Sequence, residues 1–349
     1  MRAARFDIET GGFGLKEVDV PKPGPGQVLI KVAAAGVCLS DVHIIDGSLS
    51  GFRTLSGQTE VTLGHEVAGT IEELGADVPD DLWRAGQRVV LTAGDSCGRC
   101  WNCRYHTGFC LLPVVRGVGY DGGWAEYLVT AHLSLVPLPD NVPFEQACII
   151  PDAVSTPYAA LLHRGELGVG QAVGLWGIGG LGVHAVQIAR LAGAAPIIAI
   201  DPLPHARERA LALGADLALD PADPTLAEQV GAITGGRGLD LAVDLIGHPA
   251  VRAAGDDLLA PHGKLVLVGM TEEPLHLPQA KRFNAAQHEV RGAYGGEPAD
   301  LHTLVRLAAT GRLDLSGSIT ETLPLDAAEE AVHKLENKIG NPIRIVLKP

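Results

Sequence analysis

The sequence feature that most constrains the fold is a glycine-rich segment, 177–182, which reads Gly-Ile-Gly-Gly-Leu-Gly. It follows a short apolar run and begins an amphipathic stretch. The first glycine (Gly177) permits a tight turn, the second (Gly179) lets a phosphate approach the backbone, and the third (Gly182) lets a helix pack against the preceding strand. The segment therefore predicts a strand, a tight turn and a helix whose N-terminus is suited to the phosphates of a dinucleotide.

An acidic residue, Asp201, ends the next predicted strand, 19 residues after Gly182. In a dinucleotide-binding fold an acid at this place accepts hydrogen bonds from the ribose hydroxyls and repels a 2′-phosphate. We therefore expect NAD to be preferred over NADP, although Arg207 lies close enough in the sequence to weaken that preference. A glycine turn can also be purely structural, but the strand, the helix and Asp201 together favour dinucleotide binding.

Residues 171–294 alternate short β-branched runs with amphipathic stretches, which is typical of repeated βαβ units and a parallel sheet. Strands are expected at 172–176, 197–201, 217–220, 240–245, 264–268 and 289–293. Helices are expected at 181–192, 206–213, 225–234 and 250–259. Six strands with intervening helices match a full dinucleotide fold.

The first 150 residues have a different pattern, in which short Val, Ile and Leu runs such as 28–32 are separated by Gly and Pro. This pattern predicts an antiparallel, loop-rich β domain. The tail after residue 295 is expected to fold back onto this domain, with helices at 299–309 and 326–336 and a strand at 343–347.

The chain length and composition fit two globular domains. At 349 residues the chain exceeds the usual single domain of roughly 100–200 residues. We expect one domain from 1–153 with 295–349, and the other from 154–294. The net charge of -14 argues against nucleic acid, because a phosphate backbone is bound mainly by clustered Lys and Arg.

We expect neither a signal peptide nor a membrane span. The first residues reach an acid before any apolar run, which is unlike a signal peptide. Residues 172–189 carry no formal charge and approach the length of a membrane span, but five glycines with His184 and Gln187 argue against a membrane helix.

Four of the six cysteines lie within 14 residues, in the order Cys97-x2-Cys100-x2-Cys103-x6-Cys110. Four thiolates in one loop form the closed tetrahedral set that a structural zinc prefers. A redox Cys-x-x-Cys pair is the alternative, but it needs two cysteines rather than four. We expect a structural zinc and a reducing cytoplasmic location.

A second, dispersed set comprises Cys38, His65 and Asp152, which offer one sulfur, one nitrogen and one oxygen. A catalytic zinc has three protein ligands and one open position. The residues alone do not single out this trio, because the chain has 13 histidines and 41 acidic residues.

These motifs together resemble those of the zinc-containing medium-chain alcohol dehydrogenases, over essentially the whole chain. In that family the catalytic zinc is bound by a Cys in Gly-x-Cys-x-Ser-Asp, a His in Gly-His-Glu, and a Cys or Asp just before the cofactor domain. The matching segments here are 36–41, 64–66 and Asp152. The resemblance implies an α/β protein with a GroES-like β-rich catalytic domain, a doubly wound Rossmann domain, and a catalytic zinc on Cys38, His65 and Asp152.

The resemblance also implies roles for neighbouring residues. Glu66 matches an acid that approaches the zinc during ligand exchange, and Ser40 matches the hydroxyl that receives the substrate proton. His43 matches the end of a proton relay, and Arg344 matches an arginine that reaches the pyrophosphate.

Four residues fall at positions that line the nicotinamide and ribose pocket in the family, although ordinary packing also explains such side chains. They are Thr156, Ile246, Val268 and Met270. The expected cofactor-binding residues are Thr156, Gly177, Gly179, Gly180, Leu181, Gly182, Asp201, Arg207, Ile246, Val268, Met270 and Arg344.

The sequence departs from the family pattern in one place. The family usually has seven residues between the third and fourth cysteines of the structural site, and this chain has six between Cys103 and Cys110. The shorter loop puts the geometry of the Cys110 bond in doubt. Cys148 matches no ligand and is expected to be a small buried apolar residue.

The resemblance implies an enzyme (EC 1.1.1.-) that reversibly transfers a hydride between NAD and a secondary, primary or aromatic alcohol, with two zinc ions per chain. Polyol or amino-alcohol dehydrogenases and NAD(P)H-dependent carbonyl or double-bond reductases of the same family are the alternatives. A noncatalytic nucleotide-binding protein would be expected to have lost ligands, and all seven are present. The family and the strand at 289–293 suggest a homodimer or homotetramer, with no nucleic-acid or membrane partner.

Overall fold

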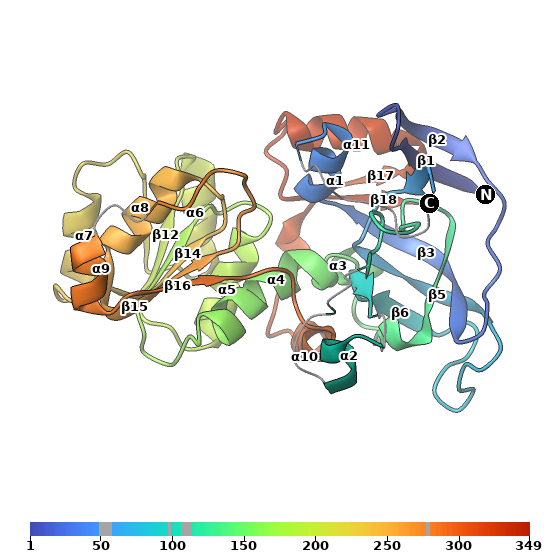
Figure 1. Cartoon of the computed structure of the whole chain (residues 1–349), viewed down its shortest axis with the longest axis horizontal. Helices are drawn as coiled ribbons and strands as arrows, with labels where there is room; N and C mark the ends of the chain where they lie inside the picture. Colours follow the sequence, from blue (N-terminus) through green and yellow to red (C-terminus); the bar gives the residue numbers. More distant parts are fainter. Residues whose placement is uncertain (49–57, 97–98, 106–109, 111–113, 277–279) are drawn as a thin grey trace. The chain divides into compact units, whose positions relative to one another are not determined.

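The computed structural model describes residues 1–48, 58–96, 99–105, 110, 114–276 and 280–349. The chain forms two compact units (Figure 1). Unit 1 comprises Met1–Asp152 and Glu297–Pro349, and unit 2 comprises Ala153–Gly296. The predicted α/β class, with one β-rich part and one parallel-sheet part, is confirmed.

Unit 1 contains most of the antiparallel structure. Its main sheet has the order β10-β6-β5-β3-β18-β17, with β9 also paired to β3, and a second sheet has the order β2-β1-β4. The strands are β1 (Arg2–Asp7), β2 (Phe13–Glu17), β3 (Gln27–Val37), β4 (Glu60–Thr62), β5 (Val67–Leu74), β6 (Arg88–Leu91), β7 (Gly94–Asp95), β8 (Val114–Val115), β9 (Tyr127–Ala131), β10 (Leu135–Pro137), β17 (Ile319–Pro324) and β18 (Arg344–Lys348).

The C-terminal tail returns to unit 1, as predicted, because β18 pairs antiparallel with β3. Strand β17, which pairs parallel with β18, was not predicted. The helices of unit 1 are α1 (Leu39–Ile45), α2 (Trp101–Tyr105), α3 (Phe144–Ala147), α10 (Pro298–Ala309) and α11 (Ala328–Glu336), with 3-10 turns η1 (His132–Ser134), η4 (Ser316–Ser318) and η5 (Leu325–Ala327). Helix α11 buries Ala328, Ala331, Val332 and Leu335, which form one helical stripe against the core of the unit.

Unit 2 is built on a six-stranded parallel sheet with the order β13-β12-β11-β14-β15-β16. Its strands are β11 (Val173–Trp176), β12 (Ile197–Ile200), β13 (Leu217–Leu219), β14 (Leu239–Asp244), β15 (Leu259–Leu267) and β16 (Glu289–Gly292). Its helices are α4 (Ser155–Tyr158), α5 (Gly182–Leu191), α6 (Pro204–Leu213), α7 (Leu226–Ile233), α8 (Pro249–Asp257) and α9 (Ala280–Ala286). All six predicted strands and four predicted helices are present, whereas α4 and α9 were not predicted.

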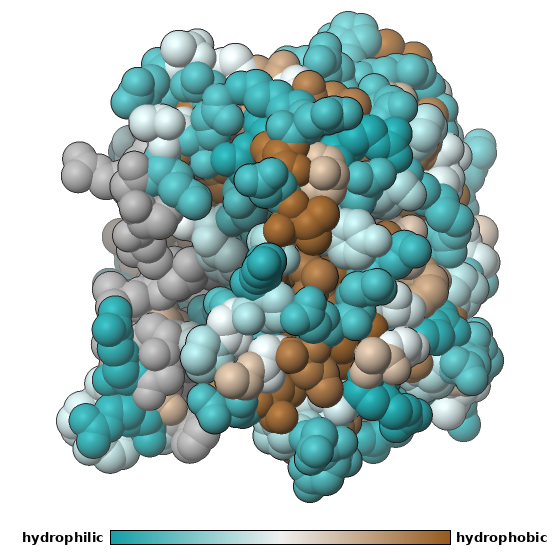
Figure 2. Space-filling model, turned by 90° about the vertical axis from the view of Figure 1, so that its right-hand side faces the viewer, coloured by the Kyte–Doolittle hydropathy of each residue, from teal (hydrophilic) through white to brown (hydrophobic). Residues whose placement is uncertain are grey.

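Two short π-helical segments, η2 (Ile150–Val154) and η3 (Ala159–Arg164), flank α4. Segments of this kind are rare and are frequent at functional sites. None of the helices in the described residues has the length and apolar character needed to cross a membrane. Figure 2 shows one face of the molecule, on which hydrophilic side chains surround a band of hydrophobic ones.

The turn before β9 is packed too tightly for any side chain at Gly122. A Cβ there would lie 2.4 Å from the carbonyl oxygen of Gly64 and 2.5 Å from that of Leu63. Because both atoms are backbone, the chain has to shift to admit a methyl group. Glycine at position 122 therefore allows this turn to pack directly against the backbone of Leu63 and Gly64.

We expect Gly122→Ala to lower the free energy of unfolding by about 1–3 kcal/mol, the usual cost of overpacking. Urea denaturation followed by tryptophan fluorescence measures this effect. Gly317→Ala is the matched control, because Gly317 is exposed and a Cβ there meets no atom within 4 Å. An unchanged midpoint for Gly122→Ala would contradict the prediction.

Candidate functional site

Three side chains from distant parts of unit 1 converge at one point: Cys38, His65 and Asp152. Their potential ligand atoms all lie within 4.8 Å of one another. Asp152 Oδ2 is 3.2 Å from Cys38 Sγ and 3.5 Å from His65 Nε2. The structure thus brings together the trio that the sequence alone could not single out.

Local chain geometry positions each member of the trio. Cys38 follows β3 and caps the N-terminus of α1, where its N–H donates to Asp41 Oδ2 at 3.0 Å. His65 follows Gly64, whose φ of 95° is in the left-handed region that favours glycine. Asp152 lies in the π-helical segment Ile150–Val154.

Asp41 is a residue of this site that sequence reasoning missed. It is wholly buried, and its Oδ1 lies 3.3 Å from His65 Nδ1. A carboxylate behind a histidine fixes the orientation of the ring and increases its basicity as a ligand. The available signal was the acid three residues after Cys38, which also forms a capping box.

A buried ion pair lies beside the trio. Arg344 on β18 contacts Glu66 Oε1 at 2.9 Å and Asp152 Oδ2 at 3.5 Å through Nη2. Gly36 makes room for this pair, since a Cβ at that position would lie 2.0 Å from Glu66 Oε2. The guanidinium of Arg344 therefore pairs with two carboxylates of unit 1, those of Glu66 and Asp152.

The charges around the trio favour a bound cation. Burial opposes the charge of Arg344, but Glu66, Cys38 and Asp152 raise its pKa above the ordinary value. Burial likewise opposes the charge of His65, but Asp41 and Asp152 raise its pKa well above the ordinary value. Both pKa shifts have the same cause, an excess of negatively charged groups around the trio. A sulfur, a nitrogen and an oxygen donor in a negative, buried setting fit zinc.

Ser40 and His43 lie on α1 close to the trio. Ser40 is exposed, and its Oγ is 3.6 Å from Cys38 Sγ. His43 is also exposed, and its Nδ1 lies 2.8 Å from Ser48 Oγ. The spacing of three residues places Ser40 and His43 on the same side of the helix.

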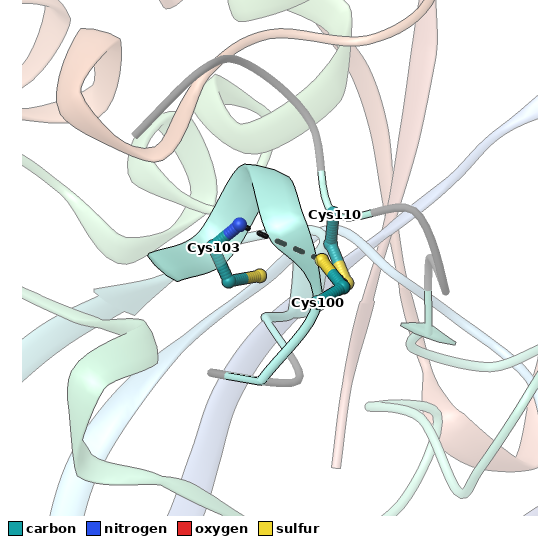
Figure 3. A group of neighbouring side chains, drawn as sticks. All are labelled: Cys100, Cys103 and Cys110. Carbon is teal, nitrogen blue, oxygen red and sulfur yellow. Dashed lines mark hydrogen bonds between the residues drawn. The ribbon is translucent and has the colours of Figure 1, made fainter. Parts of the chain in front are cut away.

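A second cluster contains Cys100, Cys103 and Cys110, whose sulfur atoms lie within 4.8 Å of one another (Figure 3). The Cys103 N–H donates to Cys100 Sγ at 3.5 Å, and Cys100 Sγ is 3.9 Å from Cys110 Sγ. Zn–S bonds of about 2.3 Å at tetrahedral angles imply sulfur atoms about 3.8 Å apart. The three thiols therefore fit zinc, and the fourth predicted ligand, Cys97, lies outside the described residues. Cys148 is fully buried, as expected.

The glycine turn of unit 2 has the predicted geometry. Gly177 has a φ of 92°, and a Cβ at Gly182 would lie 2.0 Å from the carbonyl oxygen of Gly177. A Cβ at Gly179 would meet no atom within 4 Å, so the backbone there is open to a ligand. Gly180 and Leu181 lead into α5, with Leu181 as its N-cap.

Asp201 directly follows β12 and links the turn to α6. Its Oδ2 accepts from the Ile178 N–H at 2.7 Å, and its Oδ1 accepts from the Leu203 N–H at 2.9 Å. Arg207 is bound elsewhere, because its Nη1 lies 2.7 Å from the Asp201 carbonyl oxygen and 3.0 Å from Asp220 Oδ2. The guanidinium of Arg207 is thus held by an acid and by backbone.

The four residues predicted to line the pocket all belong to unit 2. Thr156 is buried in α4, and Val268 is buried just after β15. Ile246 follows β14, Met270 follows β15, and both are exposed. A Cβ at Gly177 would lie 2.7 Å from Ile246 Cγ1, so Ile246 adjoins the glycine turn.

Unit 1 is β-rich and holds two clusters of zinc-type ligands. Unit 2 has a parallel sheet with a glycine turn suited to a dinucleotide. This combination is that of a zinc-binding, dinucleotide-dependent dehydrogenase. Residues 24–140 match the family described as alcohol dehydrogenase GroES-like domain, and residues 180–310 match the family described as zinc-binding dehydrogenase. The chain belongs to the zinc-binding medium-chain alcohol dehydrogenase family. It is therefore a zinc-dependent, NAD-linked oxidoreductase of class EC 1.1.1.-.

Individual relatives cover nearly the whole chain. The NAD-dependent alcohol dehydrogenase of Saccharolobus solfataricus is 34% identical over 353 residues, which cover 99% of this chain and 100% of that protein. The L-threonine 3-dehydrogenase of Pyrococcus horikoshii is 32% identical over 92% of this chain and 91% of that protein. The structure of an alcohol dehydrogenase from Thermus sp. ATN1 superposes with a TM-score of 0.89 at 29% identity, over 100% of this chain and 99% of that one. The predicted family and enzyme class are confirmed.

We expect Asp152→Ala to lose the zinc of the trio, because two ligands rarely retain the metal that three hold. Metal analysis of purified protein should show zinc falling from about two ions per chain to about one. NADH binding should persist, since the dinucleotide turn lies in unit 2. Asp140→Ala removes a fully exposed acid from the same unit and should change neither quantity. Undiminished zinc in Asp152→Ala would refute the ligand assignment.

We expect Cys103→Ser to lose the other zinc and to lower thermal stability, because a structural zinc contributes directly to folding energy. Zinc content and melting temperature are the measurements. Cys148→Ala, which removes a buried thiol outside both clusters, should keep both ions. Full zinc content in Cys103→Ser would show that this thiol is not a ligand.

Proposed function

We propose that the protein is an alcohol dehydrogenase that reversibly oxidises a secondary, primary or aromatic alcohol to the ketone or aldehyde with NAD. The observation that carries this proposal is the convergence of Cys38, His65 and Asp152 within 4.8 Å in a buried, negatively charged setting. Family membership supports it, because the relatives named above include the NAD-dependent alcohol dehydrogenase of Saccharolobus solfataricus.

In this proposal Cys38, His65 and Asp152 hold one zinc, and Cys97, Cys100, Cys103 and Cys110 hold the second. Zinc in the first site supplies a Lewis acid that polarises an alcohol or carbonyl oxygen, and NAD supplies the hydride acceptor. Two further groups support the ligands. The Asp41 carboxylate orients the His65 ring, and Arg344 holds Glu66 beside the site through their ion pair.

Ser40 is proposed to accept the substrate proton. Its Oγ is the exposed hydroxyl next to Cys38, and a general base has to be within reach of the proton that it accepts. His43, one turn later on α1, then takes the proton toward solvent. Ser48 accepts or donates at His43 Nδ1 at 2.8 Å and so holds the ring in place.

The adenosine half of NAD is proposed to bind at the glycine turn and Asp201. The free N–H groups at the start of α5 suit the pyrophosphate, and Asp201 suits the ribose hydroxyls. Arg207 forms an ion pair with Asp220 and is therefore not available to neutralise a 2′-phosphate, which supports a preference for NAD over NADP. Thr156, Ile246, Val268 and Met270 are proposed to line the nicotinamide and ribose site, and the pyrophosphate role of Arg344 stays a prediction.

An amino alcohol is the second candidate substrate. The observation that favours it is the similarity to the L-threonine 3-dehydrogenase of Pyrococcus horikoshii, which extends over 92% of this chain. L-threonine therefore belongs in any substrate panel beside simple alcohols.

We expect the zinc-loaded protein to reduce NAD with at least one member of a panel of primary, secondary, aromatic, polyol and amino alcohols. Absorbance at the NADH band measures the rate. Removing zinc by dialysis against a chelator should abolish turnover, whereas NADH binding should survive and zinc alone should restore activity. Full activity after metal loss, or no activity with any alcohol, would overturn the proposed function.

A further inference from the structure

A buried carboxylate in unit 2 lies where the sheet topology places ligands. The strand order changes direction between β11 and β14, and ligands of open parallel sheets bind at the carboxyl ends of strands at such a switch point. Asp244 is the last residue of β14 and is in register with Trp176, the last residue of β11. The Asp244 side chain is wholly buried.

Asp244 holds together the two loops that leave the sheet here, which we name the β14 loop (245–247) and the β15 loop (268–270). Its Oδ1 accepts from the N–H groups of Ile246 and Gly247, at 2.9 Å and 2.8 Å. Its carbonyl oxygen accepts from the N–H groups of Val268 and Gly269, both at 2.9 Å. One residue therefore fixes the backbone of both loops.

The two loops also touch directly through paired glycines. Gly247 has a φ of 87°, and a Cβ there would lie 2.9 Å from the carbonyl carbon of Gly269. A Cβ at Gly269 would lie 2.1 Å from the backbone nitrogen of Gly247. Because no side chain separates them, a shift of one loop is transmitted to the other.

Arg252 on α8 supplies the positive charge that this carboxylate needs. Its Nε lies 3.2 Å from Asp244 Oδ2, and its side chain is 7% exposed against 0% for Asp244. Its Nη1 lies 3.4 Å from the carbonyl oxygen of Glu273, just after the β15 loop. A buried carboxylate without a counter-ion is strongly unfavourable, so the Arg252 guanidinium compensates Asp244 and holds its side chain in place.

The loops present two large apolar side chains at the surface of unit 2. Ile246 is 46% exposed and Met270 is 57% exposed, and Ile246 adjoins Gly177 of the glycine turn. Exposed apolar side chains beside a phosphate-binding turn suit a flat, weakly polar ring better than a charged group. NAD has two flat rings, adenine and nicotinamide. The adenosine half is proposed at Asp201, which follows β12 on one side of the switch point, so the ring on the β14–β15 side is the nicotinamide.

We propose that Arg252 is a positioning residue for the nicotinamide half of the cofactor. Acting through the Asp244 carboxylate, it fixes the β14 loop, and the β14 loop in turn positions the β15 loop through the direct contact of Gly247 with Gly269. The side chains of Ile246 and Met270 are thereby held against the ring. The adenosine half is held by Asp201 and the glycine turn, neither of which is hydrogen-bonded to Arg252 within the described part of the chain. This inference rests on the proposed NAD-dependent function.

The test compares NADH with ADP-ribose, which lacks the nicotinamide ring, by calorimetric binding to the zinc-loaded full chain. Arg252→Met should weaken NADH binding by about tenfold or more and leave ADP-ribose within about twofold, because only the ring loses its support. Arg252→Lys keeps the charge and should restore most of the NADH affinity.

Arg252→Met leaves Asp244 unpaired and risks unfolding unit 2, so the double variant D244N/R252M, which removes both charges, is measured alongside it. It should show the same selective loss of NADH affinity. Arg282→Met is the control, since Arg282 pairs with Asp257 at the surface, and both affinities should stay unchanged.

Equal losses of NADH and ADP-ribose affinity would overturn the inference, because Arg252 would then support the whole unit. Unchanged NADH affinity in both folded variants would also overturn it. Failure of the wild-type chain to bind NADH would instead contradict the proposed function.

Discussion

The structure depends most on an imbalance of charge inside unit 1. Cys38, Glu66, Asp152 and Asp41 bring acidic groups into one buried region, and Arg344 is the cation that pairs with two of them. Burying like charges together is expensive unless a cation compensates them. A zinc ion bound by the trio would supply that compensation, so the ion proposed to serve the reaction would also stabilise the fold around it.

The strands and helices of unit 2 were readable from sequence because each carries its own signal. Strands β11 and β12 are continuous apolar runs, as expected of a sheet buried on both faces, and the glycines mark where the chain has to turn. Helix α9 was missed because its residues are all at least partly exposed and form no buried stripe. Asp244 was also missed, since its partners are the Arg252 side chain and backbone groups from two loops that no sequence pattern connects.

The site in unit 1 could be predicted only in part from the sequence. The residues of the trio are far apart in sequence, and their choice rested on resemblance to a family rather than on spacing. Asp41 carried a local capping signal that could have been used, because it lies three residues after Cys38. The contact of Arg344 with Glu66 could not be predicted, since it depends on β18 pairing with β3 at one particular register. Long-range register is a property of the folded sheet.

The π-helical segment around Asp152 makes the position of this side chain sensitive to the length of the chain. A π-helical turn contains one residue more than an α-helical turn, and each residue added or removed rotates the two flanking segments by about 100° relative to each other. Deleting one residue between Ile150 and Val154 would turn the Asp152 carboxylate away from Cys38 even if no side chain were altered. Within this stretch, chain length should therefore be under stricter selection than side-chain identity, apart from Asp152 itself.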